Sequence, residues 1–182
     1  GDIIRDNSGP RFGAFSQEDN YVFRVASGAQ VDVYHSTIAD NAAVSAVFGI
    51  AANAGSASEI RNSIIHDSSS GDILDVNFGP VDITSCILHE KLSLNLLPFP
   101  IRDDLMIDDP RFVDRAGNNY HIDPITSPAI DFATSNQSTL PDMDFETRGN
   151  DYPEVNDLFG PFEVGADEAY KPNEMFSDGF EN

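Results

Sequence analysis

The stretch VDVYHSTIADN (31–41) recurs in altered form as EIRNSIIHDSS (59–69) and VDITSCILHE (81–90). Aligning Ile38, Ile64 and Ile87 spaces the copies by 26 and 23 residues, and DIIRDN (2–7) aligns as well, with Ile4 under Ile38. A repeat of roughly 20–50 residues is typical of proteins built from stacked units. Each copy is rich in β-branched residues and bounded by turn-forming ones, which favours short strands separated by turns. The sequence therefore predicts an all-β chain.

The repeats predict a parallel β-helix, a solenoid of about three short strands per coil, with coils stacked about 4.8 Å apart. One coil cannot bury its inward face alone, so neighbouring coils supply the core. Helical periodicity is poor, and only residues 41–54 could form a helical turn or two, or equally a strand. The expected inward side chains are Val31, Val33, Ile38, Ile60, Ile64, Ile73, Val81, Ile83 and Ile87.

The second informative stretch is DPRFVDRAGNNYHIDPITSPAID (109–131), in which three prolines exclude a helix and Tyr120–Ile122 is a strand candidate. It is followed by the acidic residues of DMDFE (142–146), by Arg148 and by VGADE (164–168). This ordered series, over about residues 105–168, resembles the C-terminal end of secreted bacterial right-handed parallel β-helix proteins. These are the pectate-lyase-like proteins often labelled choice-of-anchor Q domain proteins. The resemblance implies a right-handed coil and a secreted or cell-surface location, and it names no reaction.

Three regions follow from these patterns. Residues 1–90 are expected to form coils that continue from upstream coils, and residues 91–169 a last coil and an irregular cover for the C-terminal end of the stack. Residues 170–182 form a tail whose end, FSDGFEN, resembles the F-x-D-G-F-E tails of secreted proteobacterial proteins and could be a sorting tag or a docking strand. The N-terminal edge at residues 2–7 carries no evident cap, so upstream coils, a partner strand or a second copy are expected to cover it.

Charge and composition restrict the partners. The chain of 182 residues has 31 acidic and 10 basic residues and a formal charge of −21, which repels nucleic acid and anionic membranes and attracts divalent cations. No run of about 18 apolar residues occurs, so no transmembrane segment is expected. The single cysteine, Cys86, excludes an internal disulfide and lies in an apolar stretch, where a buried hydrophobe is expected rather than a nucleophile.

The repeat alignment produces one candidate catalytic or metal-binding column. The position two residues after each aligned isoleucine is Asp40, His66 and His89, and the next position is Asn41, Asp67 and Glu90. Stacked Asp and His side chains could hold a divalent metal or transfer protons. The structural alternative is ordinary stacking of polar residues at solenoid turns.

A second candidate is the loop containing Asp142, Asp144 and Glu146, whose alternating carboxylates could bind Ca²⁺. In the resembling family this loop usually reads D-x-D-G followed by an arginine, and here Phe145 replaces the glycine. The structural alternative is an ion pair between Arg148 and Asp142 or Asp144 that locks the C-terminal region.

These observations favour a non-catalytic structural or interaction module of a secreted or cell-surface bacterial protein, which requires no cofactor and could self-associate through its strand edge. Two alternatives stay open. One is a fragment of a polysaccharide lyase or glycoside hydrolase, for which Asp40, His66 and His89 are the catalytic candidates and polysaccharide the ligand. The other is a Ca²⁺-stabilised adhesin module using the 142–146 loop.

Overall fold

The structure is a computed structural model that describes residues 3–4, 21–25, 29–41, 46–51, 58–67, 72–78, 80–90, 104–135, 141–149 and 159–169. In these residues the chain is all-β, and its single helical element is the short 3-10 turn η1 (Arg115–Gly117). The stretch left open between helix and strand, residues 41–54, contributes a strand, β5 (Ala46–Ala51). The predicted strand at Tyr120–Ile122 is confirmed as β13 (Asn119–Ile122).

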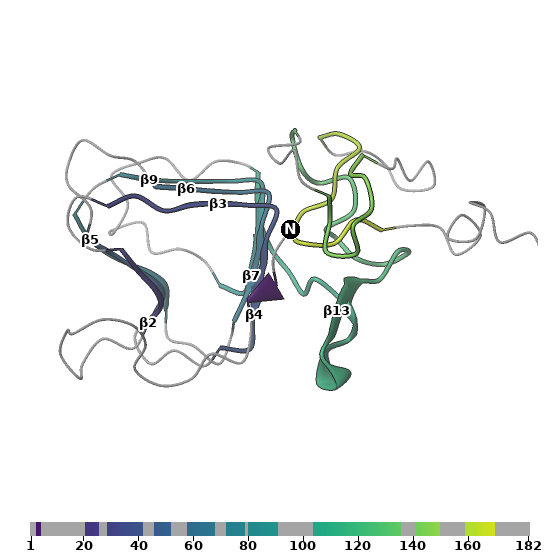
Figure 1. Cartoon of the computed structure of the whole chain (residues 1–182), viewed down its shortest axis with the longest axis horizontal. Helices are drawn as coiled ribbons and strands as arrows, with labels where there is room; N and C mark the ends of the chain where they lie inside the picture. Colours follow the sequence, from purple (N-terminus) through teal and green to yellow (C-terminus); the bar gives the residue numbers. More distant parts are fainter. Residues whose placement is uncertain are drawn as a thin grey trace, which may run out of the picture.

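Three parallel sheets form the N-terminal part (Figure 1). From β2 to β10, successive strands of the chain belong to the three sheets in a fixed rotation. One sheet contains β3 (Asp32–Tyr34), β6 (Ser58–Arg61) and β9 (Val81–Thr84). The next contains β2 (Tyr21–Val25), β5 and β8 (Asp72–Phe78). The third, five-stranded sheet has the order β1 (Ile3–Ile4), β4 (Thr37–Ala39), β7 (Ile64–His66), β10 (Cys86–Leu88) and β11 (Leu105–Ile107).

A sharp corner joins the β3–β6–β9 sheet to the five-stranded sheet. One residue in the left-handed region makes each corner: His35 (φ 44°), Asn62 (φ 50°) and Ser85 (φ 51°). The amide N–H of His35 donates to the carbonyl of Arg61, and that of Asn62 to the carbonyl of Thr84. The corners therefore stack directly on one another, although left-handed backbone is uncommon for residues other than glycine.

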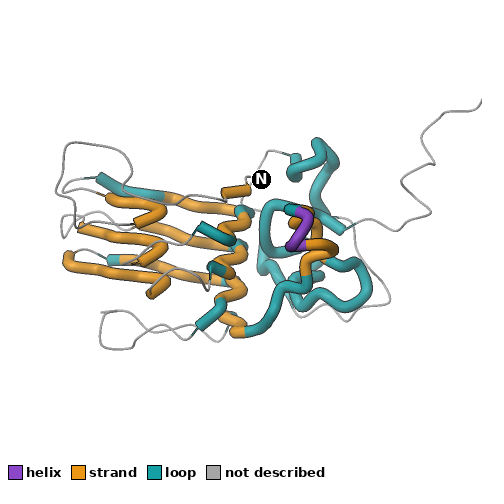
Figure 2. The backbone as a smooth tube through the Cα atoms, turned by 90° about the horizontal axis from the view of Figure 1, so that it is seen from below, coloured by secondary structure: helices purple, strands orange, loops and turns teal. Residues whose placement is uncertain are grey.

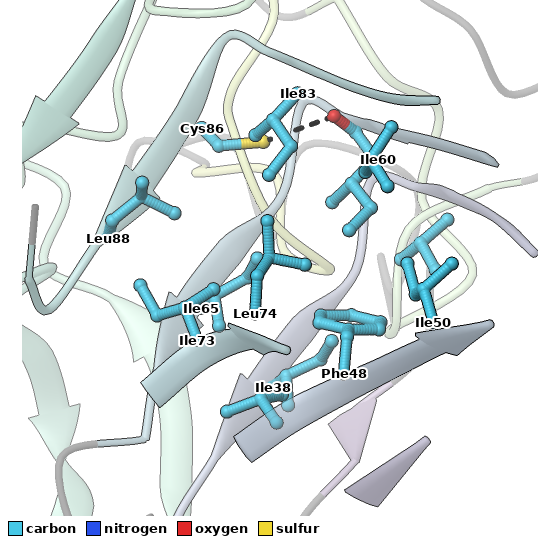
Figure 3. Packing of buried hydrophobic residues seen from close by; sticks show 13 residues of the cluster. Ile38, Phe48, Ile50, Ile60, Ile65, Ile73, Leu74, Ile83, Cys86 and Leu88 are labelled. Atoms are coloured by element: carbon cyan, nitrogen blue, oxygen red, sulfur yellow. Dashed lines mark hydrogen bonds between the residues drawn. The ribbon is translucent and has the colours of Figure 1, made fainter. Parts of the chain in front are cut away.

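The core lies between the three sheets, where side chains from all of them meet (Figure 3). Ile38, Ile65 and Leu88 reach it from the five-stranded sheet, and Phe48 stacks on Phe23 with ring centroids 5.0 Å apart. Cys86 is fully buried, and burial raises the pKa of its thiol to about 12. The expectation of a buried apolar cysteine is confirmed.

The prediction that Ile64 and Ile87 face this core is wrong. Both lie in a second apolar cluster on the opposite face of the five-stranded sheet, with Ile122, Ile130 and Val164. Neighbouring residues of a strand point to opposite faces, so Ile65 takes the inward position and Ile64 the outward one.

This outward face is covered by what we call the C-terminal region, residues 110–135, 141–149 and 159–169 (Figures 1 and 2). It contains the antiparallel pair β12 (Phe112–Asp114) and β13, joined by η1, and an isolated bridge between Ala133 and Phe162. Residues 91–169 were expected to cover the C-terminal end of the stacked strands, and the described part of this segment takes two different places. β11 adds a strand beyond β10, whereas the C-terminal region packs on the flank of the sheet.

Gly165 shows how closely the C-terminal region approaches the sheet. Its φ of +107° is unfavourable for other residues, and a Cβ at this position would lie 2.7 Å from Ile64 Cδ1. Its N–H donates to the carbonyl of Asn62 over 2.9 Å, and the neighbouring N–H of Ala166 donates to Thr37 Oγ1 over 3.0 Å. Only glycine combines this backbone conformation with this contact. The tail, residues 170–182, and the link at residues 91–103 lie outside the described part.

Candidate functional site

The strand register of the structure does not place Asp40, His66 and His89 in the single column that was predicted. β7 pairs with β10 as predicted, with Ile64 beside Ile87, but Ile38 of β4 lies beside Ile65 rather than Ile64. The predicted alignment is therefore wrong by one residue at that step, because two adjacent isoleucines gave no means of choosing between them. His66 and His89 remain neighbours, with ring centroids 6.2 Å apart, while Asp40 follows the residue that pairs with His66.

Arg115, which sequence reasoning did not select, brings Asp40 and His66 together. Its Nε lies 3.0–3.1 Å and its Nη2 2.5 Å from the Asp40 carboxylate, and the Tyr120 hydroxyl donates to Asp40 Oδ2 over 2.7 Å. The hydrogen bonds from Arg115 hold the pKa of Asp40 below its usual value, while those to Asp40 raise the pKa of Arg115. We call Asp40, Arg115 and Tyr120 the clamp. It fastens the hairpin of the C-terminal region to the corner after β4.

The Nδ1 atom of each of the two histidines lies within hydrogen-bonding distance of a polar partner. Arg115 Nη1 lies 2.8 Å from His66 Nδ1, and the N–H of Asp67 donates to His89 Nδ1 over 3.1 Å. Burial, reinforced by Arg115, lowers the pKa of His66. A neutral imidazole that accepts at Nδ1 carries its proton on Nε2. A protonated Nε2 is no metal ligand, so the contact with Arg115 does not favour a metal at His66.

The acidic loop is organised by Asp142, which is 4% exposed. Its Oδ1 accepts the N–H groups of Asp144 and Glu146 over 2.9 and 2.8 Å, and its Oδ2 that of Glu168 over 3.2 Å. Phe145, where the resembling family has glycine, has a φ of 68° and is 88% exposed. Asp142 therefore shapes the loop, and Asp144 and Glu146 extend from it toward solvent.

The expected ion pair between Arg148 and Asp142 or Asp144 is replaced by a different one. Arg148 Nη1 lies 3.4 Å from Glu168 Oε2, with both side chains fully buried, and Nη2 donates to the carbonyl of Ala166 over 2.7 Å. The same guanidinium lies 3.4 Å from His35 Nδ1, and burial with the charge of Arg148 lowers the pKa of His35 to about 3. Arg148 locks the C-terminal region, as the structural alternative supposed, but through Glu168.

Two buried acids share this environment. Glu163 is fully buried beside Glu168, and burial followed by this neighbour raises its pKa to about 11. Because Arg148 compensates Glu168, the proton belongs to Glu163, which can then donate to Glu168. Glu163 and Glu168 therefore form a buried structural pair inside the C-terminal region, with the proton on Glu163.

A third group, His121, Asp144 and Asp167, was not predicted as a set. His121 Nδ1 lies 3.1 Å from Asp167 Oδ1 and 3.4 Å from Asp144 Oδ2. Asp144 belonged to the predicted calcium loop, whereas His121 and Asp167 lie 46 residues apart in sequence. Both stand inside motifs that carried the resemblance, NYHI and VGADE, but no spacing rule places them together.

Comparisons with protein-family models, with curated proteins and with solved structures found no match. In the part of the chain that the structure describes, no helix has the length and hydropathy that a membrane crossing needs.

Proposed function

We propose that this chain is a non-catalytic structural and interaction module of a secreted or cell-surface protein, built as a parallel β-helix. The three parallel sheets, visited in turn by successive strands, support the solenoid architecture. The resemblance of the C-terminal motifs supports the secreted location. The acidic composition, with a formal charge of −21, suits a particle that stays dispersed outside the cell.

The observation that carries the proposal is the clamp. Asp40 is the carboxylate among the three catalytic candidates, and it accepts hydrogen bonds from both Arg115 and Tyr120. A catalytic acid needs a raised pKa, whereas Arg115 holds the pKa of Asp40 low. The Asp40 carboxylate, the candidate catalytic group, instead attaches the C-terminal region to the five-stranded sheet.

Removing parts of the clamp tests this assignment. Tyr120→Phe deletes one hydroxyl and leaves a buried ring in place. A hydrogen bond to a charged group contributes about 1.5–3 kcal/mol; since the Asp40 side chain is 31% exposed, we expect a loss of about 1–2 kcal/mol in urea unfolding. The wild-type chain is expected to release neither reducing ends nor unsaturated sugars from a panel of neutral and acidic polysaccharides.

Sugar release by the wild type, abolished in a folded His66→Ala or Asp40→Asn variant, would overturn the proposal in favour of a carbohydrate-active enzyme. A Tyr120→Phe variant as stable as the wild type would show that this hydrogen bond does not stabilise the fold, and the clamp would then no longer support the proposed structural role.

Interaction is proposed at the strand edge formed by β1 and β3, which end their sheets in the described part of the chain. The N–H of His35 points toward β6, so the alternation along the strand points the N–H groups of Asp32 and Tyr34 away from it. These N–H groups can pair with a strand from a second copy.

Asp32→Pro removes one outward N–H without removing a backbone hydrogen bond to β6. Asp32→Ala is the matched control, because it loses the same carboxylate, which accepts the N–H of Glu59 in β6, and keeps its own N–H. We expect light scattering to show concentration-dependent association of the wild type and of Asp32→Ala, and a weaker association of Asp32→Pro. A wild type that stays monomeric at millimolar concentration would contradict self-association through this edge.

A further inference from the structure

We infer that His121, Asp144 and Asp167 bind a divalent transition-metal ion, with Zn²⁺ the best-suited of them. The three side chains come from β13, from the 142–146 loop and from the segment 163–169, and one ligand atom of each lies within 4.8 Å of the others. One imidazole nitrogen and two carboxylate oxygens are a donor set that suits zinc better than calcium, since calcium prefers oxygen alone.

The distances suit tetrahedral coordination. Bonds of about 2.0–2.1 Å to zinc place neighbouring ligand atoms about 3.3–3.4 Å apart. His121 Nδ1 lies 3.1 Å from Asp167 Oδ1 and 3.4 Å from Asp144 Oδ2. These two separations are close to tetrahedral, and all three ligand atoms lie within 4.8 Å of one another, so an ion would draw the two carboxylates together, with water completing the coordination.

The carboxylate of Asp167 is oriented by a hydrogen bond to its second oxygen, as is usual for metal ligands. Asp167 has a side chain 5% exposed, and its second oxygen accepts the N–H of Ile122 over 2.8 Å, which leaves Oδ1 directed at His121. The backbone of Asp144 is fixed by Asp142 Oδ1. The side chains of His121 and Asp144 are 37% and 49% exposed, so the open side provides an entry path and room for water.

The local charge also calls for a cation. Asp142, Asp144, Glu146 and Asp167 surround His121, and the nearby guanidinium of Arg148 pairs with Glu168. This accumulation of negative charge is relieved by a divalent ion. The site differs from the predicted calcium loop, because it uses His121 and Asp167 and leaves Asp142 as a support.

Calorimetric titration of the EDTA-treated full chain with ZnCl₂, CaCl₂ and MgCl₂ tests the inference. We expect one saturable Zn²⁺ site per chain, with much weaker responses to Ca²⁺ and Mg²⁺. His121→Ala and the near-isosteric Asp144→Asn are each expected to weaken Zn²⁺ binding by more than about tenfold. Losses of at least this size are seen even when only a residue that supports a metal ligand is changed. Asp72→Asn, an exposed acid on β8 outside the group, is the charge-matched control and is expected to bind as the wild type does.

Thermal unfolding with and without Zn²⁺ is the second readout, because an ion that binds only the folded chain raises its melting temperature. The increase is expected in the wild type and in Asp72→Asn and is expected to vanish in Asp144→Asn, whose circular dichroism shows whether it folds. Unsaturable binding, or equal binding by His121→Ala and the wild type, would overturn the site. Ca²⁺ binding abolished by Glu146→Gln but not by His121→Ala would assign the cation to the acidic loop instead.

Discussion

Replacing Gly165 by alanine tests whether the C-terminal region is docked on the five-stranded sheet as described. At φ +107°, an alanine costs about 1–2 kcal/mol in backbone conformation. Its Cβ would also lie 2.7 Å from Ile64 Cδ1 and 3.0 Å from Thr37 Oγ1, and overpacking of this kind costs about 1–3 kcal/mol. We therefore expect Gly165→Ala to lower the free energy of unfolding by about 2–5 kcal/mol.

A second substitution separates the two contributions. Ile64→Val removes the Cδ1 atom that the new Cβ would meet, and by itself is expected to cost about 0.5–1.5 kcal/mol. In the double variant the packing conflict is partly relieved while the backbone cost stays, so its total loss should be about 1 kcal/mol smaller than the sum of the single losses. Urea unfolding followed by far-ultraviolet circular dichroism measures all four proteins; the chain has no tryptophan, so tyrosine fluorescence is the second probe. A loss below about 0.5 kcal/mol for Gly165→Ala, or strict additivity with Ile64→Val, would refute the described approach of the two segments.

Two further predictions concern buried groups. In the folded chain the pKa of Glu163 rises from its usual 4.5 to about 11, so between these pH values the folded chain keeps a proton that the unfolded chain releases, and the contribution of Glu163 to stability falls as pH rises. Glu163→Gln should therefore flatten the decline of the unfolding free energy between about pH 5 and about pH 8. Parallel wild-type and variant profiles would contradict the assignment of a buried proton to Glu163. Cys86, fully buried with a thiol pKa of about 12, should react with a thiol reagent only as fast as the chain unfolds, so fast stoichiometric labelling at neutral pH without urea would show that the core is open.

The repeat pattern was enough to predict most of the core and the strands that lie inside its copies, but it did not predict β2 or β11. Val33, Ile38, Ile60 and Ile83 are buried in the core as predicted, because β-branched residues at regular spacing between turn formers have few other arrangements available. The face assignment failed at Ile64. Two adjacent isoleucines satisfy either register, and the choice depends on an apolar partner from the C-terminal region that the repeat alone does not reveal.

The candidate sites were predictable only in part, for a related reason. Asp40 and His66 were selected from their stacking, but the residue that joins them, Arg115, is 75 residues from Asp40. His121 and Asp167 are likewise brought together by tertiary packing. Spacing rules describe ligands on one element or one loop, and they are silent when each ligand comes from a separate segment.

The clamp and the proposed metal site are linked through β13. Tyr120 and Ile122 are buried on one face of this strand, where Tyr120 reaches Asp40, and His121 lies on the other face toward Asp144 and Asp167. The segment that carries Asp167 is itself fixed to the sheet, since the N–H of Ala166 donates to Thr37. An ion at this site would therefore join three segments that are separated in sequence, and none of its three ligands belongs to the three parallel sheets. It would stabilise the folded C-terminal region, because the folded chain presents the three ligands together and the unfolded chain does not. Hydrogen exchange should then show Zn²⁺ protection concentrated in residues 119–122 and 163–169, whereas equal protection of the β2–β5–β8 sheet would mean that the ion acts elsewhere.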